Sequence, residues 1–358
     1  MTPSSDASGG SPGTCARCGA PLPEAALACL DCHHLVHAEA LGRLATSAQA
    51  AEAKEDWTAA LTAWRQTLDL LPPATQQADT IQARIVAISG RLDAGAGPPP
   101  SDGKGTPSPP PRSRSLRGIA GAVAAGAAIL WKAKFIVVFV LTKAKVLLLG
   151  LTKLPTLLSM VVTVGLYTTI FGWKFALGFV ISIYIHEMGH VVALARYGIP
   201  ATAPMFIPGF GALVRLRQYP ATPREDATTG LAGPLWGLGA ALVAGAIYLA
   251  TDSPLMAAIS RVGAWINLFN LLPVWQLDGG RGWRALDRMQ RWTAVGALVV
   301  AWAISEDSLL FFLTLLGAGR ALMETPPTTG DRRSLWMYCF LVLALAGLLW
   351  GLPDVTGV

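Results

Sequence analysis

Apolar segments separated by short charged stretches make up most of the chain from residue 118 onward. The segments of membrane-spanning length cover residues 154–173, 175–195, 228–250, 254–277 and 334–352. Since about 20 apolar residues cross a bilayer as a helix, each predicts a transmembrane helix. Two shorter apolar segments, 292–304 and 308–322, flank Glu306 and Asp307 and predict a membrane hairpin with an acidic tip.

Lysines interrupt residues 118–153, whose longest uncharged stretch, 118–131, is too short to span a bilayer. We expect an interfacial or re-entrant helix there, with a shallow hairpin as the alternative. Arginines follow the second and fourth predicted spans and precede the last one. The positive-inside rule therefore assigns these three regions to the cytosol.

The N-terminal third of the chain has a different pattern. In residues 38–93, Trp57, Leu61 and Trp64 have helical spacing, and Pro72 and Pro73 end that run. A second helical stripe follows, so we expect a helical hairpin that resembles one tetratricopeptide unit. A plain helical spacer is the alternative. Residues 94–117 are rich in Pro, Gly and Ser and predict a flexible linker.

Composition supports a membrane protein. Of the 358 residues, 53% are apolar and 14% are charged, whereas a soluble domain has about 25% charged residues. The net charge of +6 is modest and is explained by membrane orientation, so no nucleic-acid partner is expected. The first residues lack the basic and apolar regions of a signal peptide, so we expect the N-terminus in the cytosol.

Four of the five cysteines form two CxxC pairs within residues 1–37: Cys15 with Cys18, and Cys29 with Cys32. Two such pairs supply four thiolates for a tetrahedral structural zinc ion, in a zinc-ribbon-like knuckle. Disulfide pairing and a disordered tail are the alternatives. The expected cytosolic location favours zinc, because thiols stay reduced there.

The second predicted span contains His186, Glu187 and His190, an HExxH pattern within an apolar helix. Residues four apart on a helix lie about 40° apart on one face, so the two imidazoles can hold one zinc ion. Glu187 beside them can then act on a metal-bound water. Ionisable residues at membrane depth are costly and usually functional.

Asp278 is the candidate for the third zinc ligand. It follows the fourth predicted span, whose C-terminal end lies on the same side of the membrane as that of the second span. The topology therefore brings it to the depth of the two histidines. Gly279 and Gly280 after it permit a close approach of the backbone to metal or substrate.

The motif HEMGH at 186–190, followed by NLLPVWQLDG at 270–279, resembles the site-2 protease family of intramembrane zinc metalloproteases. The resemblance covers residues 154–282, the expected catalytic core, with residues 283–358 as further membrane helices. It implies zinc-dependent cleavage of membrane-tethered proteins in the bacterial cytoplasmic membrane, with Glu187 as general base and His186, His190 and Asp278 as zinc ligands. It also implies that Asn270, Pro273 and Gly279 contact the substrate.

Residues 204–217 combine proline and glycine breaks with a short alternating pattern, which predicts a β-hairpin near the active site. Its exposed strand edge would bind an unwound substrate by strand addition, and a plain loop is the alternative. The expected fold is thus an α-helical polytopic membrane protein of about six to seven spans. It carries this hairpin and a small cytosolic N-terminal module of zinc ribbon and helical hairpin.

Three kinds of partner follow: the lipid bilayer, a transmembrane protein substrate, and a peptide or protein for the N-terminal module. The alternative function is a membrane zinc transporter or scaffold without proteolysis. Glu187 argues against it, since a site that only holds zinc needs no carboxylate between its ligands.

Overall fold

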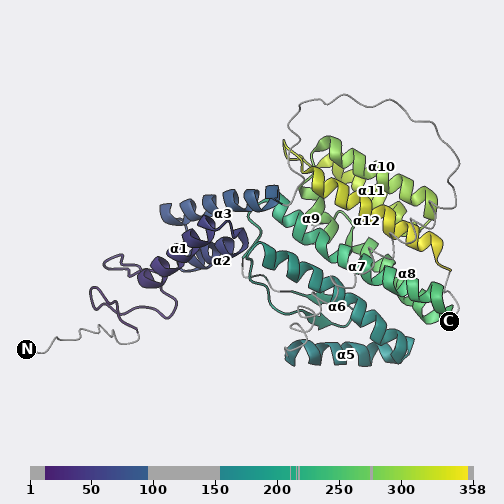
Figure 1. The fold of residues 1–358 in the computed structure, drawn as a ribbon, viewed down its shortest axis with the longest axis horizontal. Coiled ribbons are helices and arrows are strands. Elements are labelled where there is room, and N and C mark those ends of the chain that lie inside the picture. The colour runs from purple at the N-terminus through teal and green to yellow at the C-terminus, as the bar shows by residue number, and fades with distance from the viewer. Residues whose placement is uncertain are drawn as a thin grey trace, which may run out of the picture.

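The computed structural model describes residues 13–95 and 154–353, apart from 210, 215, 217, 275 and 276. A small N-terminal module packs against one end of a bundle of long helices (Figure 1). The interfacial helix expected in 118–153, and all but the first two residues of the linker expected in 94–117, lie outside the described residues.

The N-terminal module contains three helices rather than the expected two: α1 (Ala38–Ala53), α2 (Trp57–Asp69) and α3 (Gln76–Gly95). The unexpected break lies between α1 and α2, where Glu55 has a positive φ of 56°. Asp56 then begins α2 by accepting a hydrogen bond from the Ala59 amide. No Pro or Gly marks this break, so the apolar pattern alone did not predict it.

Four helices in the described part of the chain are long and apolar enough to cross a membrane: α5 (Leu154–Phe171), α6 (Trp173–Arg196), α7 (Pro223–Thr251) and α12 (Arg332–Gly351). The helices α8 (Pro254–Asn270), α10 (Arg288–Ser305) and α11 (Ser308–Met323) are shorter or less apolar and pack with them. A short helix, α9 (Asp278–Arg284), follows α8. The prediction of a helical membrane protein is confirmed. Four of the described helices meet the length and hydropathy of a span, against the six to seven spans expected from the sequence.

The fourth predicted span ends earlier than expected. We predicted membrane helix up to residue 277, whereas α8 ends at Asn270. Pro273 explains the difference, because proline lacks an amide donor and disfavours helical backbone at the preceding residue. A non-helical segment therefore connects α8 to α9, and Asp278 begins a new helix instead of ending an old one.

The predicted β-hairpin is present. Strands β1 (Met205–Ile207) and β2 (Gly211–Leu213) pair antiparallel, with Phe206 opposite Ala212. Two hydrogen bonds attach it to α5: the Phe206 amide donates to Ser159 Oγ, and the Gly209 amide donates to the Tyr167 hydroxyl oxygen. The β1 side of the hairpin is thus fixed to the first membrane helix.

Of the four apolar clusters in the described residues, the two largest determine how the parts of the molecule pack. One lies inside the bundle and joins α7 and α8 to the C-terminal helices. The other is shared between the module and the bundle, since Leu61, Trp64 and Ile85 pack with Leu194 and Tyr197 from the end of α6. The module is therefore continuous with the membrane part of the protein.

Candidate active site

The two histidines of the HExxH motif lie on one face of α6, buried between that helix and α7. Their Nε2 atoms are 3.1 Å apart. Asp278, in the first turn of α9, brings its Oδ2 atom within 3.1 Å of His186 Nε2 and 3.3 Å of His190 Nε2. His186 and Asp278, which are separated by 92 positions in the sequence, thus lie next to each other.

Hydrogen bonds fix the orientation of both imidazoles. His190 Nδ1 lies 2.8 Å from the Thr229 carbonyl oxygen, which can only accept. His186 Nδ1 lies 2.8 Å from Asn267 Oδ1, and the amide nitrogen of Asn267 donates to the Gly263 carbonyl. Both Nδ1 atoms therefore carry the proton in the neutral rings, which leaves both Nε2 lone pairs directed at Asp278.

This donor set suits a zinc ion. Two unprotonated imidazole nitrogens and a carboxylate oxygen that face one another repel, unless a cation lies between them. With zinc bonds of about 2.0–2.2 Å, neighbouring ligand atoms of a tetrahedral site are about 3.3–3.6 Å apart. The observed separations are slightly shorter. All three side chains border a cavity, so a zinc ion that they held would have room for a fourth ligand, as catalytic zinc sites require.

A cavity of about 500 Å³ opens beside the three residues. Glu187 lines it together with the two histidines and Asp278, so the carboxylate borders the same space as the donor atoms. The remaining lining comes from α5, α6, α8, α9 and the β-hairpin, and includes Tyr167, Phe179, Gly211, Ala212, Val214, Leu216, Phe269, Asn270 and Arg281.

The three residues expected to contact substrate differ in position. Asn270 lines the cavity, whereas Pro273 and Gly279 are not among its lining residues. Gly279 is buried against the backbone of Leu271, where a Cβ atom would lie 1.9 Å from the carbonyl oxygen. The carbonyl of Pro273 accepts a hydrogen bond from Arg320 on α11. In this structure both residues contribute to packing around the site.

Besides Thr229, two residues that lie against the histidines were not predicted from the sequence. Asn267 accepts the hydrogen bond from His186. Its polar side chain in an otherwise apolar helix, three residues before Asn270, could have identified it in the sequence. Gly233 on α7 faces the metal-ligand atoms directly, since a Cβ there would lie 2.2 Å from His190 Nε2 and 2.7 Å from His186 Nε2. The AGP sequence around it gave no indication of this contact.

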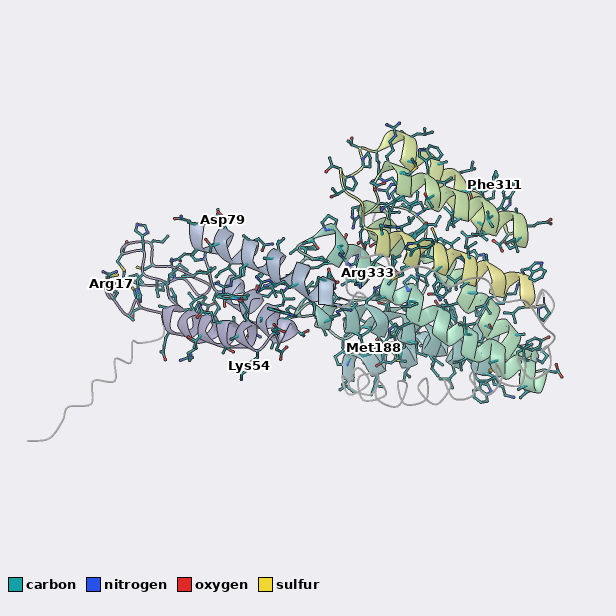
Figure 2. All side chains as sticks on the ribbon, turned by 45° about the horizontal axis from the view of Figure 1, so that its top comes forward. Arg17, Lys54, Asp79, Met188, Phe311 and Arg333 are labelled. Atoms are coloured by element: carbon teal, nitrogen blue, oxygen red, sulfur yellow. The ribbon has the colours of Figure 1, made fainter. Side chains whose placement is uncertain are left out.

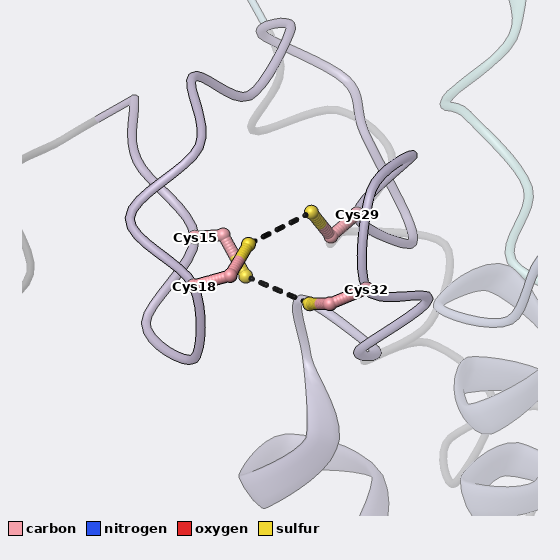
Figure 3. Close-up of side chains that lie close together, drawn as sticks. All are labelled: Cys15, Cys18, Cys29 and Cys32. Carbon is pink, nitrogen blue, oxygen red and sulfur yellow. Dashed lines mark hydrogen bonds between the residues drawn. The ribbon is translucent and has the colours of Figure 1, made fainter.

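The four cysteines of the knuckle also converge, at the far end of the module (Figure 3). Cys15 and Cys32 have their Sγ atoms 3.6 Å apart, and those of Cys18 and Cys29 are 3.5 Å apart. A disulfide would require about 2.05 Å, whereas thiolates around a tetrahedral zinc ion lie about 3.8 Å apart. The spacing therefore suits a structural metal ion.

Within the knuckle, the surroundings favour the thiolate form of Cys15, whereas contacts with the neighbouring thiols raise the pKa of Cys18. Backbone hydrogen bonds from Cys18 and Arg17 lower the pKa of Cys15 to about 6, and the thiolate is the form that binds metal. Arg17 lies at the tip of the module, whereas Met188 of the HExxH motif lies inside the helical bundle (Figure 2). The two candidate metal sites are thus in different parts of the molecule.

Comparison with known proteins is consistent with this geometry. The model of peptidase family M50 matches residues 174–253, which include the HExxH motif and end before Asp278. The zinc metalloprotease MJ0392 of Methanocaldococcus jannaschii is 26% identical over 115 residues, 30% of this chain and 32% of the relative. The putative zinc metalloprotease Rip3 of Mycobacterium tuberculosis is 30% identical over 136 residues, 34% of each chain.

The chain thus aligns with about one third of the length of the curated relatives it matches. These matches confirm the resemblance to the site-2 protease family, which the family model shows for residues 174–253. The role of Asp278 depends on the geometry, because it lies outside the matched family region.

Proposed function

Starting from the match to the site-2 protease family, we propose that this protein is a zinc-dependent intramembrane endopeptidase that cleaves membrane-tethered proteins. The observation that carries the proposal is the convergence of His186, His190 and Asp278 beside Glu187 at one cavity. The two imidazoles and the carboxylate would hold the zinc ion, and Asn267 and the Thr229 carbonyl orient the imidazoles. Such outer partners commonly alter metal affinity by about 10- to 100-fold.

The side chains around the cavity have distinct roles in this proposal. A zinc ion held by these three residues would act as a Lewis acid on the scissile carbonyl and on water. Glu187 accepts the proton of the attacking water and delivers it to the leaving amine. Such general acid–base catalysis typically contributes about 10²- to 10⁴-fold. Asn270, on the same cavity wall, holds the substrate carbonyl through its carboxamide.

A transmembrane substrate must unwind before cleavage, because its peptide bonds are hydrogen-bonded within the helix. Gly211 and Ala212 of β2 line the cavity, while the β1 side of the hairpin is attached to α5. We propose that an unwound segment pairs with the outer edge of β2. Strand addition satisfies its backbone groups and presents an extended peptide to Glu187.

Charge at the two ends of the bundle supports one orientation in the membrane. The end that carries the module also carries most of the arginines, including Arg196, Arg224, Arg284 and Arg333. The opposite end carries Asp252, Glu306 and Asp307. The positive-inside rule therefore supports our proposal that the module lies on the cytosolic side; the bacterial cytoplasmic membrane is proposed from the family resemblance alone.

Substitution of Glu187 by glutamine tests the proposal. Purified Glu187→Gln should retain as much zinc as the wild-type protein, since the metal ligands are unchanged. It should lose cleavage of a transmembrane substrate by about 10²- to 10⁴-fold. A Glu187→Gln protein that cleaves at the wild-type rate would exclude the proposed mechanism. If the wild-type protein carries zinc across liposome membranes and cleaves no substrate, the transporter alternative is favoured.

A further inference from the structure

Arg65 of α2 is a buried cation at the junction between the module and the bundle. Its side chain is 3% exposed. The guanidinium donates from Nε to the carbonyl oxygen of Tyr197 at 2.9 Å. It also donates from Nη2 to both carboxylate oxygens of Glu225, at 3.2 and 3.0 Å. One rigid fork thus connects three segments that are distant in the sequence.

Both partners of Arg65 belong to helices that form the candidate active site. Tyr197 is the C-cap of α6, two turns beyond His190. Glu225 lies in the first turn of α7, is fully buried, and is four residues before Thr229. The Thr229 carbonyl accepts the hydrogen bond from His190 Nδ1. Arg65 therefore fixes the end of α6 relative to the segment of α7 that orients His190.

A second polar cluster attaches the end of α3 to the same helix ends. Asp93 accepts a hydrogen bond from the Tyr197 hydroxyl at 2.7 Å and lies 3.4 Å from the Arg224 side chain. Arg333, at the start of α12, donates to the Asp93 carbonyl, and its labelled side chain lies where the module meets the bundle (Figure 2). The contact between module and bundle thus extends over α6, α7 and α12.

The apolar contact reaches the wall of the cavity. Leu194, Val214 and Leu216 line the active-site cavity and also belong to the core that they share with the module. Gly198, which has a φ of +66°, lies against the backbone of α2, where a Cβ would be 2.5 Å from the Thr62 nitrogen. The module thus supports the cavity wall from behind.

We propose that the helical module is an integral part of the catalytic unit and that Arg65 is a positioning residue for the zinc ligands. This inference builds on the proposed function. Arg65 acts through Tyr197 and Glu225: it sets the spacing of α6 and α7, and thereby the orientation of His190. Loss of the guanidinium leaves Glu225 buried without its cationic partner, so these helix ends move apart.

The test compares Arg65→Gln with a matched variant, Arg84→Gln, in full-length protein. Arg84 forms a two-contact ion pair with Glu52 inside the module. We expect Arg65→Gln to lower kcat by about 10- to 100-fold with little change in KM, because the chemistry depends on precise geometry. We expect Arg84→Gln to keep the wild-type kcat.

Two further variants make the test independent of one substitution. Arg65→Lys keeps the charge and lacks the fork, so its kcat should lie between those of the wild type and Arg65→Gln. Gly198→Ala disturbs the same contact without removing a charge and should also lower kcat. If Arg65→Gln does not fold, these two variants carry the comparison.

Zinc retention supplies a measurement that does not depend on proteolysis. After dialysis against a chelator, Arg65→Gln should retain less zinc than Arg84→Gln, because the histidines are less well oriented. Equal kcat and equal zinc retention in the two variants would overturn the positioning role, even if Arg65→Gln melts earlier. If the wild-type protein retains zinc but cleaves no substrate, the proposed function is wrong. The difference in zinc retention between Arg65→Gln and Arg84→Gln would still test the positioning role of Arg65 in that case.

Discussion

The orientation of two imidazole rings depends on acceptors from two other helices, the Thr229 carbonyl on α7 and the Asn267 carboxamide on α8. The HExxH spacing alone predicts that His186 and His190 share a helix face, because four residues complete about 1.1 turns. It does not predict which ring nitrogen faces the metal. A backbone carbonyl carries no signature in the sequence, so the Thr229 contact required the three-dimensional structure.

Gly233 allows a prediction at this scale. In Gly233→Ala the new methyl group would overlap both Nε2 atoms, so the histidines must rotate away from Asp278. We expect loss of one zinc ion per chain and of cleavage activity, measured by elemental analysis and a substrate assay. Gly239→Ala is the control on the same helix, since nothing lies within 4 Å of its Cβ position. Wild-type zinc content in Gly233→Ala would contradict the proposed ligand arrangement.

At the scale of elements, hydropathy predicted the helices well because each apolar segment has a charged or polar boundary. The predicted end of α8 was seven residues too late. The apolar residues that follow Asn270 belong to a non-helical connection, because Pro273 disfavours helical backbone there. The early end leaves Asn270 at the cavity and lets Asp278 begin α9. The β-hairpin was predictable from its glycines, whereas its attachment to Ser159 and Tyr167 of α5 was not.

Strand β2 carries a prediction about substrate binding. Ala212→Pro removes the backbone donor at the centre of the strand, so pairing with an unwound substrate should weaken. We expect a higher KM and slower cleavage for a transmembrane substrate. Ala212→Val keeps the amide and favours extended backbone, so it should cleave at close to the wild-type rate. Equal activity of the proline and valine variants would argue against strand addition at β2.

At the scale of the whole molecule, the Pro-rich segment after residue 93 indicated two separable modules. The structure shows a shared apolar core and a buried ion pair between them instead. Such a contact cannot be predicted from the sequence, because Arg65 and Glu225 are 160 positions apart. Arg65 lies in an ordinary amphipathic helix, and Glu225 is an acidic residue in the first turn of a helix, where such residues are common. The packing of the N-terminal helices against the bundle therefore could not be predicted from the sequence.

The two parts of the N-terminal region should behave differently when altered. Replacing Cys15 and Cys18 by serine should remove one zinc ion per chain, because it destroys the knuckle, and should leave cleavage largely intact, since the knuckle lies at the tip of the module. Deleting residues 1–95 should abolish cleavage, because it removes the support of α6 and α7. Full activity in the deletion variant would mean that the module is only a spacer.

The central claim is zinc-dependent cleavage inside a membrane segment, and metal removal in a reconstituted system tests it most directly. The wild-type protein and a transmembrane substrate are placed in liposomes, treated with a chelator, and then given zinc, with product masses measured at each stage. We predict a cut within the apolar segment of the substrate, its loss on chelation, its return with zinc, and no cut at any stage with Glu187→Gln. Cleavage that persists after the metal is removed would contradict the account. So would a zinc-loaded wild-type protein that does not cleave substrates that span the membrane.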